Sequence, residues 1–281
     1  MEWILKMPSF IERPAIDDIN LLDTIIDERN EPNKSFFKAY RNGWELRYEE
    51  YIRNHGNPKR ISISSTHITN NKTKFINLYS SPRGTIESDI IDVLEEHELS
   101  HCPFCSSLGV PDTLDHFLPK DTYPEYAIFS HNLIPCCDSC NRAKSTKVLK
   151  NGKRIFLHPY YDMAEDMEIY NLVIKPAYEN APDFELVVNN GLKNKYKKIA
   201  KRHLKELKIE ERFRKYFKSQ YRRLIKNVKQ NKQTSNTDLL TLLNIFLTNS
   251  LNVDINYWDT LFYKSVINNQ ELLDYLEDID E

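Results

Sequence analysis

Through most of the first hundred positions, apolar residues recur every three or four places, which is the period of a helix that buries one face. Many of these residues are large and aromatic, as in a packed core. We therefore expect a mostly helical N-terminal region over residues 1–98. The positions that set the pattern are Ile19, Leu22, Ile25, Ile26, Phe36, Phe37, Tyr40, Trp44 and Tyr51.

The helical pattern is interrupted between residues 61 and 79, where Ser, Thr and Asn are frequent and apolar residues alternate at the start. This composition favours a loop or a short pair of strands. A helix is expected to follow Gly84, because Thr85 or Ser88 can cap its first turn. Its apolar face would consist of Ile86, Ile90, Val93 and Leu94.

The second half of the chain changes period twice. Asn151-Gly152 lies between two β-favouring runs and is typical of a two-residue hairpin turn. A second strand pair is predicted at residues 170–175 and 184–188, which are rich in β-favouring side chains. Helical spacing then returns, with a break expected near Ile209.

The chain has 281 residues, of which 40% are hydrophobic, enough to bury one large core or two small ones. No stretch approaches the ~18 consecutive apolar residues of a membrane span, and residues 1–10 lack the pattern of a secretory signal. We therefore expect a cytoplasmic protein without a membrane partner. Thiols stay reduced in that compartment, which favours metal binding over disulfides.

Charge is segregated along the chain, although the formal net charge is only -2. Residues 193–232 contain seventeen Lys or Arg against three Glu, whereas residues 238–281 contain nine acidic residues against one Lys. The basic segment could line a duplex backbone without reading bases. The alternatives are a solvated helix face, or docking to an acidic partner or to the acidic C-terminal segment. The residues expected to contact nucleic acid here are Lys197, Lys198, Lys201 and Arg202.

Four of the five cysteines form two pairs, each with two residues between its members. This spacing indicates a closed tetrahedral zinc site that would clamp two distant stretches of backbone together. Cys136 lies directly before the second pair and is expected in the core. The expected zinc ligands are Cys102, Cys105, Cys137 and Cys140.

Two histidines near this segment leave more than one interpretation open. His101 precedes Cys102, where it could donate a hydrogen bond to a zinc thiolate or be an ordinary solvated histidine. His158 follows the predicted hairpin and could be a further metal ligand, a phosphate contact or a structural residue.

The dipeptide Asp115-His116 lies between the two cysteine pairs, and Asn141 follows the last cysteine. Hydrolysis of a phosphodiester needs a base that takes a proton from water and a cation that neutralises the oxygens at phosphorus. A neutral imidazole, with an ordinary pKa near ~6.5, suits the first task, so we expect His116 to be the base. Carboxylate and amide oxygens suit Mg²⁺ or Mn²⁺, so Asp115 and Asn141 are the expected ligands.

The order of Asp115-His116, Asn132 and Asn141, flanked by cysteine pairs, resembles the HNH (ββα-metal) endonuclease motif over about residues 102–147. The resemblance implies that Asp115 binds the catalytic metal, that His116 activates water and that Asn132 braces the loop holding His116. It also implies that Asn141 completes the metal site, at a position where the eponymous pattern has His. The nearby cations expected to contact flanking phosphates are Lys120, Arg142 and Lys144.

The predicted fold class is α+β, with a small zinc-clamped ββα nuclease core between helical flanks. The resemblance implies an endonuclease that hydrolyses DNA, with Mg²⁺ or Mn²⁺ at the catalytic site and Zn²⁺ at the structural site. The chain is also similar to nuclease subunits of bacterial antiphage systems of the Septu type, which implies an ABC-type ATPase partner. A stand-alone restriction-type nuclease and a non-catalytic zinc module that binds nucleic acid or protein are the alternatives, and an oligomer is left open. The expected segments are 1–98 (helical), 99–160 (nuclease core), 161–192 (β-rich extension) and 193–281 (helical).

Overall fold

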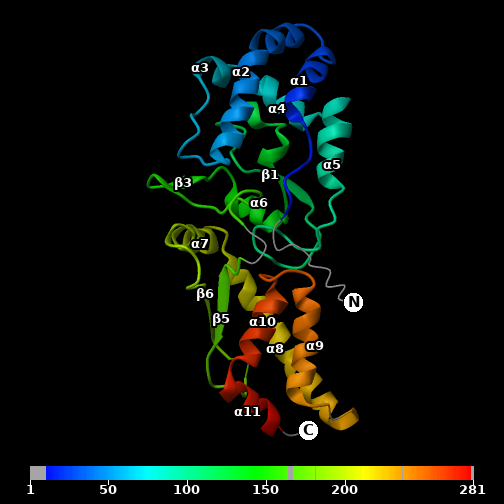
Figure 1. Cartoon of the computed structure of the whole chain (residues 1–281), viewed down its shortest axis with the longest axis vertical. Coiled ribbons are helices and arrows are strands. Elements are labelled where there is room, and N and C mark those ends of the chain that lie inside the picture. Colours follow the sequence, from blue (N-terminus) through cyan, green and yellow to red (C-terminus); the bar gives the residue numbers. More distant parts are fainter. Residues whose placement is uncertain (1–10, 164–166, 181, 236, 280–281) are drawn as a thin grey trace, which may run out of the picture. The chain divides into compact units, whose positions relative to one another are not determined.

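The computed structural model describes residues 11–163, 167–180, 182–235 and 237–279 (Figure 1). Within these ranges most of the regular structure is helical, and the strands form three two-stranded antiparallel sheets, which confirms the α+β class. The chain divides into two compact units, described here one at a time. The described residues of the first unit are 11–104 and 109–163, and those of the second unit are 105–108, 167–180, 182–235 and 237–279.

The N-terminal part of the first unit is mostly helical between Asp18 and Glu95, and residues 1–10 of the helical segment expected over 1–98 lie outside the described residues. The side chain of Asp17 caps its first helix by accepting a hydrogen bond from Asn20 N. The core of this region is largely aromatic, and Phe37, Trp44 and Phe75 pack ring to ring with centroids 5.2 Å apart. The elements are α1 (Asp18–Asp27), α2 (Asn33–Asn54), α3 (Thr66–Asn70), α4 (Lys72–Ser80), the π-helical turn η1 (Glu87–Ile91) and α5 (Asp92–Glu95).

The prediction of a loop or strand pair over residues 61–79 was wrong, because α3 and α4 occupy most of it. Ser65 caps α3 by accepting a hydrogen bond from Ile68 N. Phe75 and Leu78, three positions apart, form the buried face of α4. Tertiary burial of these side chains outweighs the low helix propensity of Ser, Thr and Asn.

The helix expected after Gly84 is present as η1 and α5, but without the predicted cap. Thr85 N and Oγ1 instead donate hydrogen bonds to the Glu28 carboxylate, at 3.0 and 2.7 Å from Oε1. Ile86, Ile90 and Leu94 are buried as expected, whereas Val93 is 50% exposed.

The central segment has the order strand, strand, helix. Strand β1 (Thr113–His116) pairs antiparallel with β2 (Leu133–Cys136), with Asp115 opposite Ile134. Helix α6 (Asp138–Lys144) follows and contacts β1. The predicted hairpin is confirmed, since Asn151 and Gly152 both adopt positive φ between its strands. The remaining elements of this unit are the 3₁₀ turns η2 (Pro124–Tyr126) and η3 (Ser130–Asn132), β3 (Leu149–Lys150) and β4 (Lys153–Arg154).

The second unit contains the other predicted strand pair and five helices among its described residues. The helical break expected near Ile209 is confirmed at Lys208, which adopts a left-handed φ of 52°. No helix in the described ranges combines the length and apolarity needed to cross a membrane. The elements are β5 (Tyr170–Ile174), β6 (Phe184–Val188), α7 (Asn194–Glu206), α8 (Ile209–Thr234), α9 (Leu239–Leu251), α10 (Trp258–Ile267) and α11 (Gln270–Asp278).

Candidate metal and catalytic site

The four paired cysteines come together in space. Their sulfur atoms all lie within 4.8 Å of one another. Zn–S bonds of about 2.3 Å in a tetrahedron separate the sulfurs by about 3.8 Å, which lies within this bound, so the cluster could hold a zinc ion. Cys137 lies at the N-cap of α6, and its backbone N–H donates to Cys102 Sγ at 3.4 Å. The cluster therefore joins the start of α6 to the segment before β1.

Asp115 lies on β1 with only 3% of its surface exposed. Its Oδ2 atom is 2.8 Å from Lys144 Nζ, which also donates to His116 O at 2.6 Å. Burial raises the pKa of Asp115, and the Lys144 charge opposes that rise. Lys144 was expected among the phosphate contacts, but its side chain is fully buried and is engaged by β1.

His116, at the end of β1, donates through Nε2 to Ala127 O at 2.8 Å. A carbonyl oxygen only accepts, so Nε2 carries the ring proton and Nδ1 carries the lone pair. Burial, and next the charge of Lys120, lower the pKa of His116 to about 3. The imidazole is therefore neutral at pH 7. Its Nδ1 atom makes no hydrogen bond to a residue that the structure describes.

Asn132, which is fully buried, fixes the loop between β1 and β2. Its Nδ2 donates to Leu118 O at 3.0 Å and Tyr126 O at 3.1 Å, and its Oδ1 accepts from Leu118 N at 2.7 Å. Tyr51 of α2 lies 3.1 Å from the same Oδ1 atom. The side chain thus uses both ends of its amide on the loop that starts directly after His116.

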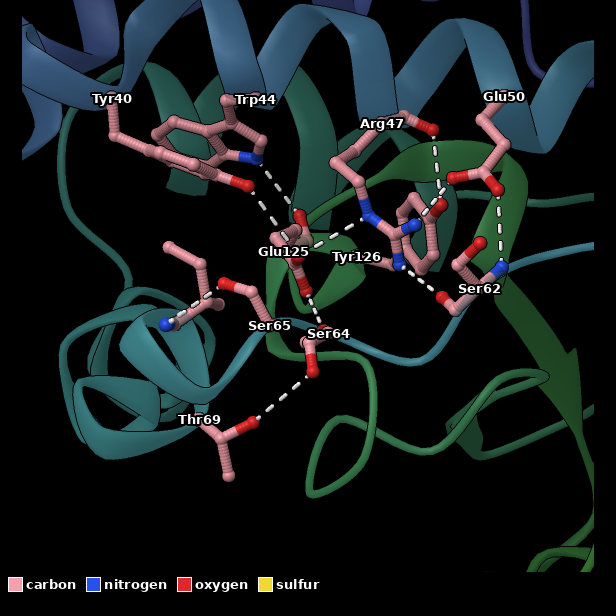
Figure 2. A network of polar contacts seen from close by, with 11 residues as sticks. Tyr40, Trp44, Arg47, Glu50, Ser62, Ser64, Ser65, Thr69, Glu125 and Tyr126 are labelled. Atoms are coloured by element: carbon pink, nitrogen blue, oxygen red, sulfur yellow. Dashed lines mark hydrogen bonds and ion pairs between the residues drawn. The ribbon is translucent and has the colours of Figure 1, made fainter.

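Glu125 anchors the other end of that loop (Figure 2). Its buried carboxylate accepts from Ser64 Oγ and lies 3.1 Å from Arg47 Nε. Trp44 Nε1 donates to the backbone carbonyl of Glu125 at 2.8 Å. These contacts hold the turn η2 against α2, and so fix the position of Ala127, the acceptor for His116.

The residues expected to hold a catalytic metal retain suitable donors. Asp115 Oδ1 and the side-chain amide of Asn141 make no hydrogen bond within the described part of the chain. A carboxylate and an amide oxygen are the donors that a hard divalent cation prefers. Asn141 is half-buried on α6, the helix that contacts β1. These two residues therefore fit Mg²⁺ or Mn²⁺ by donor chemistry.

The predicted basic residues occupy different environments. Arg142 is exposed and pairs with Asp138, whereas Lys120 is half-buried. In the second unit, Lys198 and Lys201 are exposed on α7, and Lys197 and Arg202 are half-buried there. The buried face of that helix consists of Ile199, Ala200 and His203.

The structure also decides between interpretations left open above. His158 is fully buried, with Nε2 2.9 Å from Tyr51 OH and Nδ1 accepting from Tyr160 N at 3.2 Å, so it is structural. His101 is buried, which excludes the solvated alternative. Cys136 is buried beside Thr113 Oγ1, as expected for a core residue.

Sequence reasoning missed contacts of α2, α4 and η2 that support the site. Tyr51 fitted the helical core pattern, but neither its hydrogen bond to Asn132 nor the contacts of Glu125 gave a local signal, because each partner is more than sixty positions away. Tyr79, whose ring lies against His116 with centroids 4.4 Å apart, falls in the segment that was expected to lack helices.

Two curated proteins are similar to parts of this chain. Protein ea31 of Escherichia phage lambda is 27% identical over 188 residues, which cover 60% of this chain and 62% of ea31. Septu protein PtuB of Bacillus thuringiensis is 36% identical over 63 residues, covering 22% of this chain and 24% of PtuB. The matched part is thus less than two thirds of either relative. No family model matches the chain, and no solved structure matches it.

Proposed function

We propose that the first unit carries a metal-dependent endonuclease site of the HNH type that hydrolyses DNA phosphodiesters. The observation that carries the proposal is the hydrogen bond of His116, whose Nε2–H is committed to Ala127 O, so that Nδ1 keeps its lone pair. This base is adjacent in sequence to a buried carboxylate that retains an oxygen donor. The four-cysteine cluster and the partial likeness to PtuB give further support.

In this mechanism His116 Nδ1 takes a proton from water. The water oxygen forms a bond to phosphorus while the bond from phosphorus to the departing sugar oxygen breaks. Asp115 Oδ1 and the Asn141 amide oxygen would hold Mg²⁺ or Mn²⁺, which supplies neutralisation of charge on the phosphoryl and leaving oxygens when bound. Lys144 keeps Asp115 in position through Oδ2, and the four cysteines would hold a structural Zn²⁺.

The setting that we propose is antiphage defence beside an ABC-type ATPase partner. It rests on the resemblance of the central segment to Septu-type nuclease subunits and on the partial match to a Septu protein. A stand-alone restriction-type nuclease would cut without that partner. A non-catalytic zinc module would bind nucleic acid or protein and cut nothing.

The test is cleavage of supercoiled plasmid by the purified chain with Mg²⁺ or Mn²⁺, alone and with a candidate ATPase. We expect His116→Ala to abolish cleavage without loss of zinc, because it removes the base and no cysteine. His67→Ala, at an exposed histidine of α3, is the matched control. Asp115→Ala and Asn141→Ala should also raise the metal concentration that any remaining turnover needs. Substantial cutting by His116→Ala would refute the assignment.

A further inference from the structure

Lys120 forms no ion pair with a described residue, although the charges of Asp121 and Asp115 act on it and oppose the lowering of its pKa by burial. Its Nζ atom lies 4.3 Å from the centroid of the Tyr79 ring. The adjacent carboxylate, Asp121, pairs instead with Lys72 at 3.0 Å. Among the described residues, no acidic side chain forms an ion pair with Lys120. A half-buried ammonium on an aromatic face is thus available to an external anion.

Tyr79 holds this ammonium beside the proposed base. The Tyr79 and His116 rings meet edge to face, with centroids 4.4 Å apart and planes at 77°. Tyr79 OH donates to Leu114 O at 3.3 Å, two residues before His116 on β1. One ring of α4 therefore contacts both the imidazole and the Lys120 ammonium, while its hydroxyl is tied to the strand that carries His116.

The two lysines near β1, Lys144 and Lys120, differ in burial and in the groups that they contact. Lys144 is fully buried, and Asp115 and His116 O engage its ammonium. Lys120 is half-buried, and the Tyr79 ring that it contacts also touches the imidazole of His116. Only Lys120 of this pair combines proximity to the proposed base with access from outside.

We propose that Lys120 is a catalytic residue that binds a non-bridging oxygen of the phosphodiester next to His116, and that Tyr79 is the positioning residue that holds its ammonium there. The ligand class is a phosphate of a nucleic-acid backbone, which would supply the direct ion-pair partner that the described residues do not provide. Lys120 thereby stabilises the negative charge that develops when water attacks phosphorus. The inference rests on the proposed nuclease function.

The test is a double-mutant cycle with Lys120→Gln, Tyr79→Leu and the double variant, measured as kcat and KM for plasmid cleavage. Lys120→Gln should lower kcat by about 100-fold, as loss of one donor to a developing anion does. Tyr79→Leu should lower it by about 2- to 30-fold, the range of a cation–π contact. Tyr79→Phe keeps the ring face and should lose less than Tyr79→Leu.

The double-mutant cycle distinguishes a role of Tyr79 in positioning Lys120 from a role in packing alone. If Tyr79 acts through Lys120, then Tyr79→Leu has no further effect in the Lys120→Gln background. Additive losses, or full activity of Lys120→Gln while His116→Ala is inactive, would overturn the inference and leave the nuclease proposal standing. Phe36→Leu removes a ring that lies 5.3 Å from Lys74, and it serves as the matched control. Zinc content and circular dichroism identify variants that fail to fold.

A binding measurement separates this inference from the nuclease proposal. In the His116→Ala background, with no added Mg²⁺ or Mn²⁺, Lys120→Gln should weaken binding of a short DNA duplex. The slope of log affinity against log salt should flatten by up to ~0.9, the value for one lost phosphate contact. If wild type does not cleave DNA and Lys120→Gln still flattens this slope, the phosphate site is supported and the nuclease proposal fails. An unchanged slope and affinity would overturn the phosphate site.

Discussion

At the scale of single residues, the first unit depends on a few buried polar side chains whose hydrogen-bonding capacity is used fully. Asn132 is the clearest example, because its amide donates to two carbonyls and accepts from Leu118 N and Tyr51. Only a side chain with both a donor and an acceptor end can make this set of bonds. A carboxylate of the same shape would face two carbonyl oxygens without a proton to give.

We therefore expect Asn132→Asp to lower the free energy of unfolding by about 2–5 kcal/mol, since it leaves buried acceptors unsatisfied. Urea unfolding at pH 7 measures this. Tyr51→Phe removes one hydroxyl from the same network and, as the matched control, should cost about 1 kcal/mol. Equal effects of the two variants would contradict the central role given to the amide.

At the scale of secondary-structure elements, α6 carries both proposed metal sites. Cys137 and Cys140 lie at its start, Asn141 comes next, and Lys144 in its last turn reaches β1. The position of the helix is therefore set by the cysteine cluster at one end and by a buried ion pair at the other.

Replacing any one cysteine of the cluster by Ser should release zinc and reduce the yield of folded protein, because metal binding is coupled to folding. Elemental analysis should find about one zinc per wild-type chain, as for a single tetrahedral site. Cys136→Ala, in the adjacent buried position, should keep its zinc. A zinc-free wild type that is fully folded would exclude the structural role of the cluster.

Helix α7 carries its own prediction. Charge reversal at Lys197, Lys198, Lys201 and Arg202 should weaken DNA binding and flatten its salt slope by up to ~0.9 per lost contact. The metal requirement for cleavage should not change. The same change at four exposed cations of the first unit is the control, namely Lys38, Arg53, Lys59 and Arg60. Normal DNA binding combined with loss of a protein partner would identify α7 as a docking surface.

The sequence predicted most elements and the order of the site residues, but not the tertiary contacts that hold those residues in position. Local spacing was enough for the hairpin at Asn151 and for the helical break at Lys208, since turn geometry is a local property. It failed for α4, whose helical state depends on burial of Phe75 against α2. Lys144 was also misjudged from the sequence. Its charge is evident there, but its burial and its ion pair with Asp115 depend on the fold.

At the scale of the whole molecule, one half-buried and one buried titratable group make stability depend on pH in opposite directions. Burial lowers the pKa of His131 to about 4, so the unfolded chain takes up a proton that the folded chain does not. Its contribution to the stability of the folded chain is complete above pH ~6.5 and is lost as the pH falls toward 4. Burial raises the pKa of Asp18 to about 7, so its contribution is complete below pH ~4 and is lost as the pH rises toward 7.

We therefore expect two variants to change the pH profile with opposite signs. Between pH 4 and pH 6, the unfolding free energy of wild type minus that of His131→Gln should increase as the pH rises. The increase should be up to about 1.4 kcal/mol per pH unit. The difference between wild type and Asp18→Asn should move the other way in that window. Urea unfolding at several pH values measures both, and parallel profiles for the three proteins would refute the assignment.

The bonds from α2 into the loop after β1 also bear on how such a gene can change. Trp44 and Tyr51 donate to acceptors about eighty positions further along the chain. If recombination exchanged only the cysteine-flanked segment between related genes, the new loop could lack acceptors in positions that these donors of α2 can reach. An exchange that keeps these hydrogen bonds therefore has to include α2 together with the central segment.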